Sequence, residues 1–174
     1  MTQHKSDEVV RGWFAGRLPS DWFVAAPEIT IDREEIVVVG EVAAPTLAEG
    51  ASDAERKAAA AGRIKAFRED TRGRRMDIAD EAEHRFGRKV AWGAACGERR
   101  ELFTNLSIPV MTRLRQRDRI VLDTLVDAGV ARSRSDALAW SVRLVGKHAD
   151  EWLGQLRDAM RAVEEVREAG PTAS

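Results

Sequence analysis

Between Leu106 and Leu114 every second side chain suits a buried surface, and this alternation constrains the fold more than any other feature of the chain. The two interleaved series are Leu106, Ile108, Val110, Thr112 and Leu114, and Ser107, Pro109, Met111, Arg113 and Arg115. A period of two predicts a β-strand with one apolar face. Pro109 cannot donate a ladder hydrogen bond, which indicates an edge position, a strand start or a gap in the pairing. The strand therefore cannot lie in the centre of a large sheet.

Two short helices are predicted directly after this strand. The first has apolar residues at helical spacing from Ile120 to Val126 and stops at Gly129, a residue that suits the end of a helix. A turn over residues 130–134 follows, and Ser135 is the predicted N-cap of the second helix. One face of that helix carries Leu138, Val142 and Val145.

This order of strand, helix and helix, joined by Gly-Val-Ala-Arg-Ser-Arg-Ser-Asp-Ala-Leu, resembles the ribbon-helix-helix family of DNA-binding proteins. The resemblance covers about residues 106–145, under a quarter of the chain. Two features depart from the family pattern: Pro109 lies inside the strand, and a long junction over residues 115–119 precedes the first helix. The resemblance implies a homodimer, because one strand with two helices buries its apolar face only against a second copy.

The resemblance also implies how such a dimer meets DNA. Its two strands pair as an antiparallel ribbon that fits the major groove, with outward side chains at the base edges. By the alternation, the base-contacting residues are Met111, Arg113 and Arg115. A slip of one residue would turn Val110 and Thr112 outward instead.

The start of the second helix is the predicted contact with the DNA backbone. Free amides and the positive end of a helix attract phosphate, and the residues expected there are Arg132, Ser133, Arg134 and Ser135. Between Leu106 and Arg143 seven arginines stand against four aspartates, so the local charge is positive. The alternative interpretation is an ordinary solvated surface with no ligand.

Residues 1–100 predict a separate α+β domain, so the whole chain is expected to be α+β. Strands are expected near residues 28–42 and 88–97, and helices near 52–86. The aromatic pairs Trp13-Phe14 and Trp22-Phe23 are interpreted as core anchors, with a nucleotide-stacking platform as the alternative. The boundary is expected near residues 96–101, and residues 101–174 form the second domain.

A third helix is predicted over residues 149–169 of the second domain. Its apolar residues are spaced four, three, four and three apart, as in a coiled coil: Trp152, Leu156, Ala159, Val163 and Val166. This stripe is expected to extend the dimer interface or to cover the front half.

The formal net charge of −1 excludes a uniformly basic nucleic-acid coat, so any nucleic-acid site must be local. No apolar run is long enough to span a bilayer, and residues 1–8 lack the pattern of a secretory signal. Cys96 is the sole cysteine and cannot form an internal disulfide. We expect a cytoplasmic protein with no membrane partner.

Sequence motifs for metal, cofactor or catalytic sites are lacking. His4, His84 and His148 are far apart, and one cysteine gives no zinc-ligand spacing. There is no phosphate-binding glycine-rich loop, dinucleotide fingerprint or nucleophile elbow. Cys96 is interpreted as a small buried hydrophobe. We expect no cofactor and no enzymatic activity; an enzyme with a non-standard site ranks third among the hypotheses.

Our first hypothesis is a homodimeric, DNA-binding transcriptional regulator, of which an antitoxin is one form. Double-stranded DNA is its expected partner, and residues 1–100 would sense a signal or bind a protein partner such as a toxin. The alternative is an interaction protein that uses the ribbon-helix-helix unit only to dimerise. In that case the front half would bind an RNA, a ribosome-associated partner or another protein.

Overall fold

A computed structural model describes residues 3–170 and shows an α+β fold in two compact units. Unit 1 ends at Ile108 and unit 2 begins at Pro109. Each unit has its own buried cluster of apolar side chains. No helix among residues 3–170 combines the length and apolar character needed to cross a membrane. The α+β class predicted from the sequence is thus confirmed.

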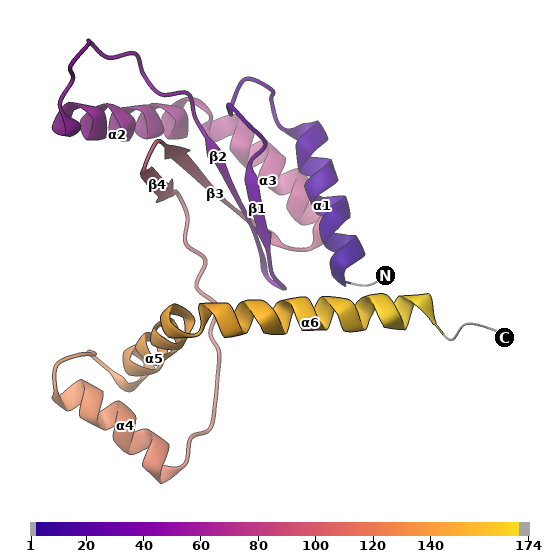
Figure 1. Ribbon diagram of the computed structural model, residues 1–174, viewed down its shortest axis with the longest axis vertical. Helices are drawn as coiled ribbons and strands as arrows, with labels where there is room; N and C mark the ends of the chain where they lie inside the picture. Colours follow the sequence, from indigo (N-terminus) through magenta and orange to yellow (C-terminus); the bar gives the residue numbers. More distant parts are fainter. Residues whose placement is uncertain (1–2, 171–174) are drawn as a thin grey trace. The chain divides into compact units, whose positions relative to one another are not determined.

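Unit 1 combines three helices with a four-stranded sheet (Figure 1). In chain order its elements are α1 (Gln3–Arg17), β1 (Glu28–Ile31), β2 (Glu35–Glu41), α2 (Asp53–Asp70), α3 (Arg72–Phe86), β3 (Lys89–Cys96) and β4 (Arg99–Leu102). The strands expected near 28–42 and 88–97 and the helices expected near 52–86 are therefore present. Helix α1 and strand β4 are absent from the sequence prediction.

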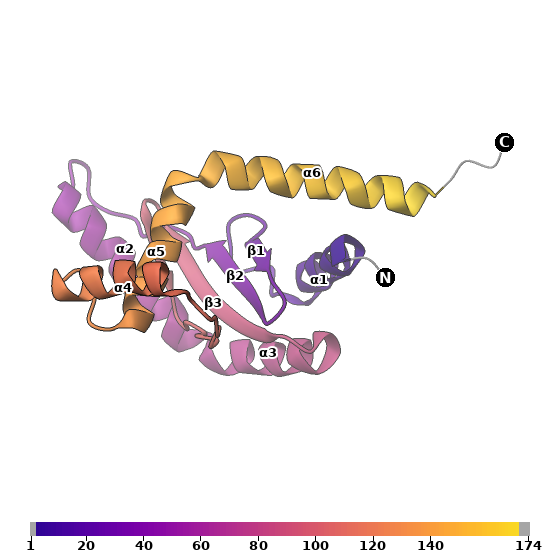
Figure 2. The same ribbon diagram turned by 90° about the horizontal axis from the view of Figure 1, so that it is seen from below.

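The sheet has the order β1-β2-β3-β4, with a mixed pattern of strand directions. The outer pairs, β1 with β2 and β3 with β4, are antiparallel, whereas β2 and β3 run parallel with Val38 opposite Trp92. Parallel neighbours need a long crossover, and α2 with α3 provides it. Figures 1 and 2 show α3 lying along β3, which it contacts directly.

The core of unit 1 lies between one face of this sheet and the three helices. Even-numbered residues of β2 and β3 point into it, since side chains alternate along a strand. The buried members are Val10, Phe14, Trp22, Ile36, Val38, Val42, Ile64, Phe67, Ile78, Ala82, Trp92, Ala94 and Cys96. Trp22 contacts both Phe67 and Trp92 edge-to-face, with ring centroids 5.7 and 6.1 Å apart. The aromatic pairs are therefore core anchors, as expected.

Gly40 interrupts this face of β2 because an aromatic ring occupies the space of a side chain. A Cβ atom built on Gly40 would lie 2.2 Å from Cδ1 of Phe23. The amide of Val24 then donates to the carbonyl of Glu41, fixing the segment after Trp22 beside the strand. The glycine is thus needed for close approach, not for an unusual backbone angle.

The helical stretch expected near residues 52–86 is broken at Thr71, which separates α2 from α3. Arg75 is buried at this break, and its guanidinium donates hydrogen bonds to two oxygen atoms there. Its Nε donates to the Thr71 hydroxyl (2.9 Å), and its Nη2 donates to the carbonyl of Arg68 (2.7 Å). Burial, together with the nearby arginines 68 and 72, lowers the pKa of Arg75. Helix α2 begins with a capping box between Ser52 and Glu55.

The division between the units lies beyond the boundary expected near residues 96–101. Gly97 adopts a left-handed conformation with φ of 58° and turns the chain back, so that β4 pairs with β3. The amide of Phe103 then donates to the carbonyl of Trp92. Residues up to Ile108 consequently belong to unit 1.

Unit 2 is helical: α4 (Gln116–Asp127), α5 (Arg134–His148) and α6 (Asp150–Ala169). Gly129, with φ of 73°, follows the end of α4 as expected. Only Leu122, Ala131 and Ala137 are buried in the cluster of the described part of this unit, with Leu114, Leu125, Val126 and Leu138 packed around them. This is a small core for three helices.

Candidate nucleic-acid interface

The segment predicted as the ribbon strand is extended in the single chain and belongs to no sheet. Residues 104–115 form no helix or strand, and unit 2 begins within them at Pro109. The side chain of Met111 is 99% exposed and that of Val110 is 84% exposed. An antiparallel ribbon requires a second chain, so the strand pairing stays a prediction.

One contact determines which way the end of this segment faces. Leu114 packs against the buried cluster of unit 2, while Met111, Arg113 and Arg115 are exposed. Leu114 thus points inward, and its odd-numbered neighbours point to solvent. Val110 and Thr112 are exposed as well, so the outward facing of Met111, Arg113 and Arg115 in a ribbon stays a prediction.

Arg115 also starts helix α4. It is the N-cap residue, and its carbonyl accepts hydrogen bonds from the amides of Asp118 (3.1 Å) and Arg119 (3.0 Å). Arg119 in turn donates from Nη1 to the carbonyl of Leu114 at 2.7 Å. The long junction 115–119 is therefore mostly the first turn of α4, and Arg119 holds it to the extended segment. Sequence reasoning gave Arg119 no role, and no motif marks it.

The start of α5 differs from the prediction in its cap. Ser133 is the N-cap residue: its hydroxyl accepts from the amide of Asp136 at 3.2 Å. The carboxylate of Asp136 accepts from the amide of Arg132 at 3.0 Å. Ser135, the predicted cap, lies within the helix and is exposed. The prediction of Ser135 as cap is wrong, because Ser133 and Asp136 together form a Ser-x-x-Asp pattern that serves the earlier start.

The two arginines expected at the phosphate have different surroundings. Arg134 binds Asp123 of α4 through two hydrogen bonds, from Nε (2.6 Å) and Nη2 (2.7 Å). The hydrogen bond and charge of Arg134 lower the pKa of Asp123. Arg132 is 96% exposed at its side chain and makes only a loose ion pair, 3.8 Å, with Asp136. Arg132 is thus the freer of the two to reach an anion.

Much of the apolar surface of unit 2 is uncovered in the single chain. On α6 the stripe of Trp152, Leu156, Val163 and Val166 is exposed, together with Met160. Helices α4 and α5 add exposed apolar residues: Ile120, Val121, Val142, Leu144 and Val145. Surfaces of this kind mark interaction sites.

Metal and acid-base chemistry find little support in the same region. Among residues 3–170, no three side chains of the His, Cys, Asp or Glu types lie close enough together to hold a metal ion. His84 and His148 lie in separate units, and the side chain of His4 lies outside the described part of the chain. Cys96 is buried, and burial raises the pKa of its thiol, as does the charge of Glu41.

Comparison with known families divides the chain at nearly the same place as the structure. A family described as "Rv1265-like protein, N-terminal domain" matches residues 8–102, more than half of the chain. The chain belongs to the Rv1265-like family. A second family, described as "Mb1296 C-terminal domain", matches residues 115–167, which include α4, α5 and most of α6. Residues 103–114, with Met111 and Arg113, lie between the two matches.

Curated members of the Rv1265-like family are highly similar to this chain. "Uncharacterized protein Rv1265" of Mycobacterium tuberculosis (strain ATCC 25618 / H37Rv) is 59% identical over 159 residues, which cover 91% of this chain and 69% of the relative. "Uncharacterized protein Mb1296" of Mycobacterium bovis (strain ATCC BAA-935 / AF2122/97) has the same identity and coverage. No solved structure matches the chain. Membership in the Rv1265-like family thus rests on sequence over both units.

Proposed function

We propose that the chain is a homodimeric, DNA-binding transcriptional regulator of the cytoplasm. In the dimer, residues 106–114 of the two copies pair as an antiparallel ribbon that enters the major groove. Met111, Arg113 and Arg115 of each copy meet the base edges. The observation that carries this proposal is an exposed segment that leads directly into the helical core: residues 104–113 are exposed, and Leu114 packs on that core.

The small core of unit 2 supports the homodimer. Three buried residues leave most apolar side chains of α4, α5 and α6 in contact with water. At about 25 cal/mol per Å², covering this surface with a second copy would add substantial stability. Residues 106–114 have no strand partner in the single chain, and backbone groups exposed in this way favour pairing with another strand.

Contacts to the DNA backbone are proposed at the start of α5. Arg132 supplies the exposed charge, and the exposed residue Ser135 is the second residue of the helix. Ser133 and Arg134 hold the helix start in place through Asp136 and Asp123, so their roles are chiefly positional. A backbone contact of this kind strengthens binding to every sequence alike.

Binding to random genomic DNA fragments at two salt concentrations tests the proposal. We compare the wild type with Arg113→Ala, after confirming by sedimentation that both are dimers. Each lost phosphate or base contact weakens binding, and added salt weakens it further through counterion release. We expect Arg113→Ala to bind more weakly, by about 1–3 kcal/mol if the arginine makes a bidentate base contact.

Arg11→Ala is the matched control, because Arg11 is an exposed arginine of α1 in unit 1. This variant should bind DNA as the wild type does. A confirmed dimer that binds no DNA even at low salt would overturn the proposal. That result would favour the alternative in which the unit only dimerises and the front half binds an RNA or a protein.

A further inference from the structure

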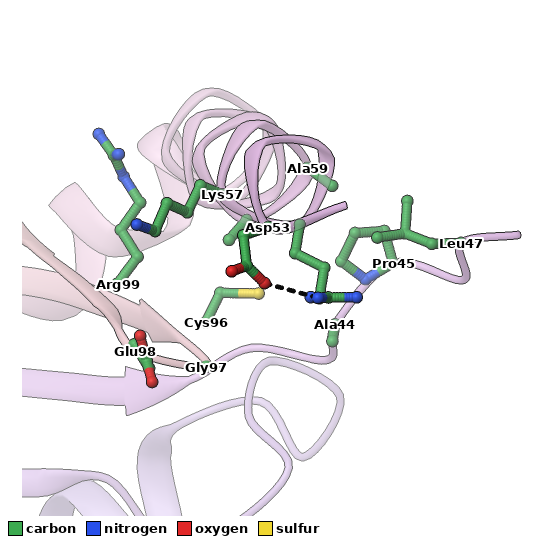
Figure 3. Close-up of a pocket in the computed structure, with 12 residues that line it drawn as sticks. Ala44, Pro45, Leu47, Asp53, Lys57, Ala59, Cys96, Gly97, Glu98 and Arg99 are labelled. Atoms are coloured by element: carbon green, nitrogen blue, oxygen red, sulfur yellow. Dashed lines mark hydrogen bonds and ion pairs between the residues drawn. The ribbon is translucent and has the colours of Figure 1, made fainter. Parts of the chain in front are cut away.

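Unit 1 contains a cavity of about 710 Å³ that the proposed DNA-binding function does not use (Figure 3). It lies between the loop after β2, the first turns of α2 and the turn that joins β3 to β4. Small-molecule sites commonly enclose about 300–1,000 Å³. The cavity therefore has room for a compact organic molecule.

Most of the cavity wall is apolar. Pro45 and Leu47 line it from the loop, Ala60 lines it from α2, and Cys96 lines it from the end of β3. Cys96 is 2% exposed and Ala60 packs against the core cluster, so this wall is rigid. Burial raises the pKa of the Cys96 thiol, which disfavours the negatively charged thiolate. Such a wall favours a hydrocarbon or aromatic group.

Three cationic side chains line the cavity, Arg56, Lys57 and Arg99, and two of them are paired. Arg56 is paired with Asp53 at 2.6 Å and also donates to the carbonyl of Ala51, and Arg99 is paired with Glu101 at 2.5 Å. Among residues 3–170, Lys57 has no ion-pair or hydrogen-bond partner. Figure 3 shows Lys57 of α2 and Arg99 of β4 at the same end of the cavity.

Two acidic residues, Asp53 and Glu98, also line the cavity. Asp53 is occupied by Arg56, as the dashed line in Figure 3 marks. Glu98 lines the cavity from the β3–β4 turn, where Figure 3 shows it next to Gly97. An anion beside Lys57 would therefore meet an ammonium group with no partner among residues 3–170, and the guanidinium of Arg99, which is paired with Glu101, lies at the same end.

We propose that this cavity binds a small organic anion whose carboxylate pairs with Lys57 and Arg99. The apolar body of the ligand lies against Leu47, Ala60 and Cys96. The site goes beyond the proposed DNA-binding function and does not depend on it. It would give unit 1 the role of detecting a metabolite.

Cys96 supplies a reporter at the cavity wall, since it is the sole cysteine of the chain. Iodoacetamide alkylates its sulfur: the thiolate attacks the methylene carbon and iodide leaves, which intact-mass spectrometry detects. We measure the rate of Cys96 alkylation in the presence of octanoate, 1-octanol or octylammonium, which have the same hydrocarbon chain and differ in charge. At ten times its Kd, octanoate should slow alkylation about tenfold, because only the free protein reacts.

The neutral 1-octanol and the cationic octylammonium should each slow the alkylation of Cys96 much less than octanoate does at equal concentration. In Lys57→Glu, protection by octanoate should be lost. Lys65→Glu is the matched control: Lys65 lies on the same helix, pairs with Glu69 and does not line the cavity. This control should keep the protection.

Melting temperature gives a second measurement on the same proteins. Octanoate should raise the melting temperature of the wild type and of Lys65→Glu, but not that of Lys57→Glu. Equal protection by octanoate and 1-octanol would overturn the proposal, as would protection that survives in Lys57→Glu. Absence of both protection and thermal stabilisation in the wild type would also overturn it. Neither experiment contains DNA, so the ligand proposal can fail without affecting the DNA-binding proposal.

Discussion

Arg134, at the first position of α5, binds the carboxylate of Asp123 on α4 with both Nε and Nη2, at 2.6 and 2.7 Å. A two-pronged pair of this kind fixes direction as well as distance. It joins the two helices whose contact forms the small core of unit 2. Arg134 therefore orients the loop that carries Arg132.

The Asp123–Arg134 pair predicts a pH dependence of stability. The pKa of Asp123 is lowered in the folded chain, first by the hydrogen bond from Arg134. A lowered carboxyl pKa means that the pair stabilises unit 2 fully above the unfolded value, about 3.9, and loses this effect as pH falls through the folded value. We expect Asp123→Asn to remove part of the loss of melting temperature between about pH 5 and pH 2.

Asp127→Asn is the control for this experiment, because Asp127 lies on the same helix and is exposed. Circular dichroism melting curves at a series of pH values compare the three proteins. If the Asp123→Asn and wild-type curves change with pH identically, the pair contributes nothing to acid stability.

The cap of α5 predicts that alanine substitution lowers stability at Ser133 but not at Ser135. Ser133→Ala removes the hydroxyl that accepts from the amide of Asp136, which should cost about 1 kcal/mol. Ser135→Ala leaves this cap in place and should change stability little. Hydrogen exchange of the amides in residues 133–137, read by mass spectrometry, should quicken only in Ser133→Ala. Faster exchange in Ser135→Ala alone would mean that the helix begins later than described.

The contact of Phe23 with Gly40 predicts that a single methyl group destabilises unit 1. Gly40→Ala would place its Cβ within the Phe23 ring, and relieving this overlap should cost about 1–3 kcal/mol. Gly62→Ala is the contrasting variant, since nothing lies within 4 Å of the added Cβ on α2. It should leave the protein up to about 1 kcal/mol more stable, because alanine favours helix. Urea unfolding measures both, and a neutral Gly40→Ala would contradict the described packing.

The apolar stripe of α6 predicts the effect of charge on the proposed dimer. Leu156→Glu with Val163→Glu would place two carboxylates in an apolar interface. Sedimentation should show a dimer Kd raised at least tenfold, which corresponds to about 1.4 kcal/mol or more. Arg161→Glu, away from the stripe, is the control and should dimerise as the wild type does. Unchanged dimerisation of the double variant would show that α6 lies outside the interface.

Local sequence signals predicted most helices and strands of this fold. Gly129 marked the end of a helix, and the structure confirms it. Helix α1 was not predicted, because its aromatic residues Trp13 and Phe14 indicate burial without indicating the type of element. Strand β4, Arg99–Leu102, was missed because three of its four residues are charged and its pairing with β3 is a tertiary contact.

Only part of the candidate interface could be predicted from the sequence, because some of its contacts form only when separate elements pack together. Alternation along the chain predicted Met111 and Arg113 as outward residues, but Val110 and Thr112 are exposed too, because the segment has no partner strand in the single chain. The partner of Arg134 was not predicted, because Asp123 is eleven residues away and the pair forms only when α4 and α5 pack. The cavity beside Lys57 depends on three segments meeting in space, which no local pattern reports.

The anchoring of Leu114 has a consequence for how this protein tolerates insertions and deletions during evolution. Because facing alternates from a fixed inward residue, adding one residue between Pro109 and Leu114 would turn every side chain before it to the opposite face. Adding two would preserve the facing and only lengthen the segment. Among natural homologues, length changes here are therefore expected to come in even numbers.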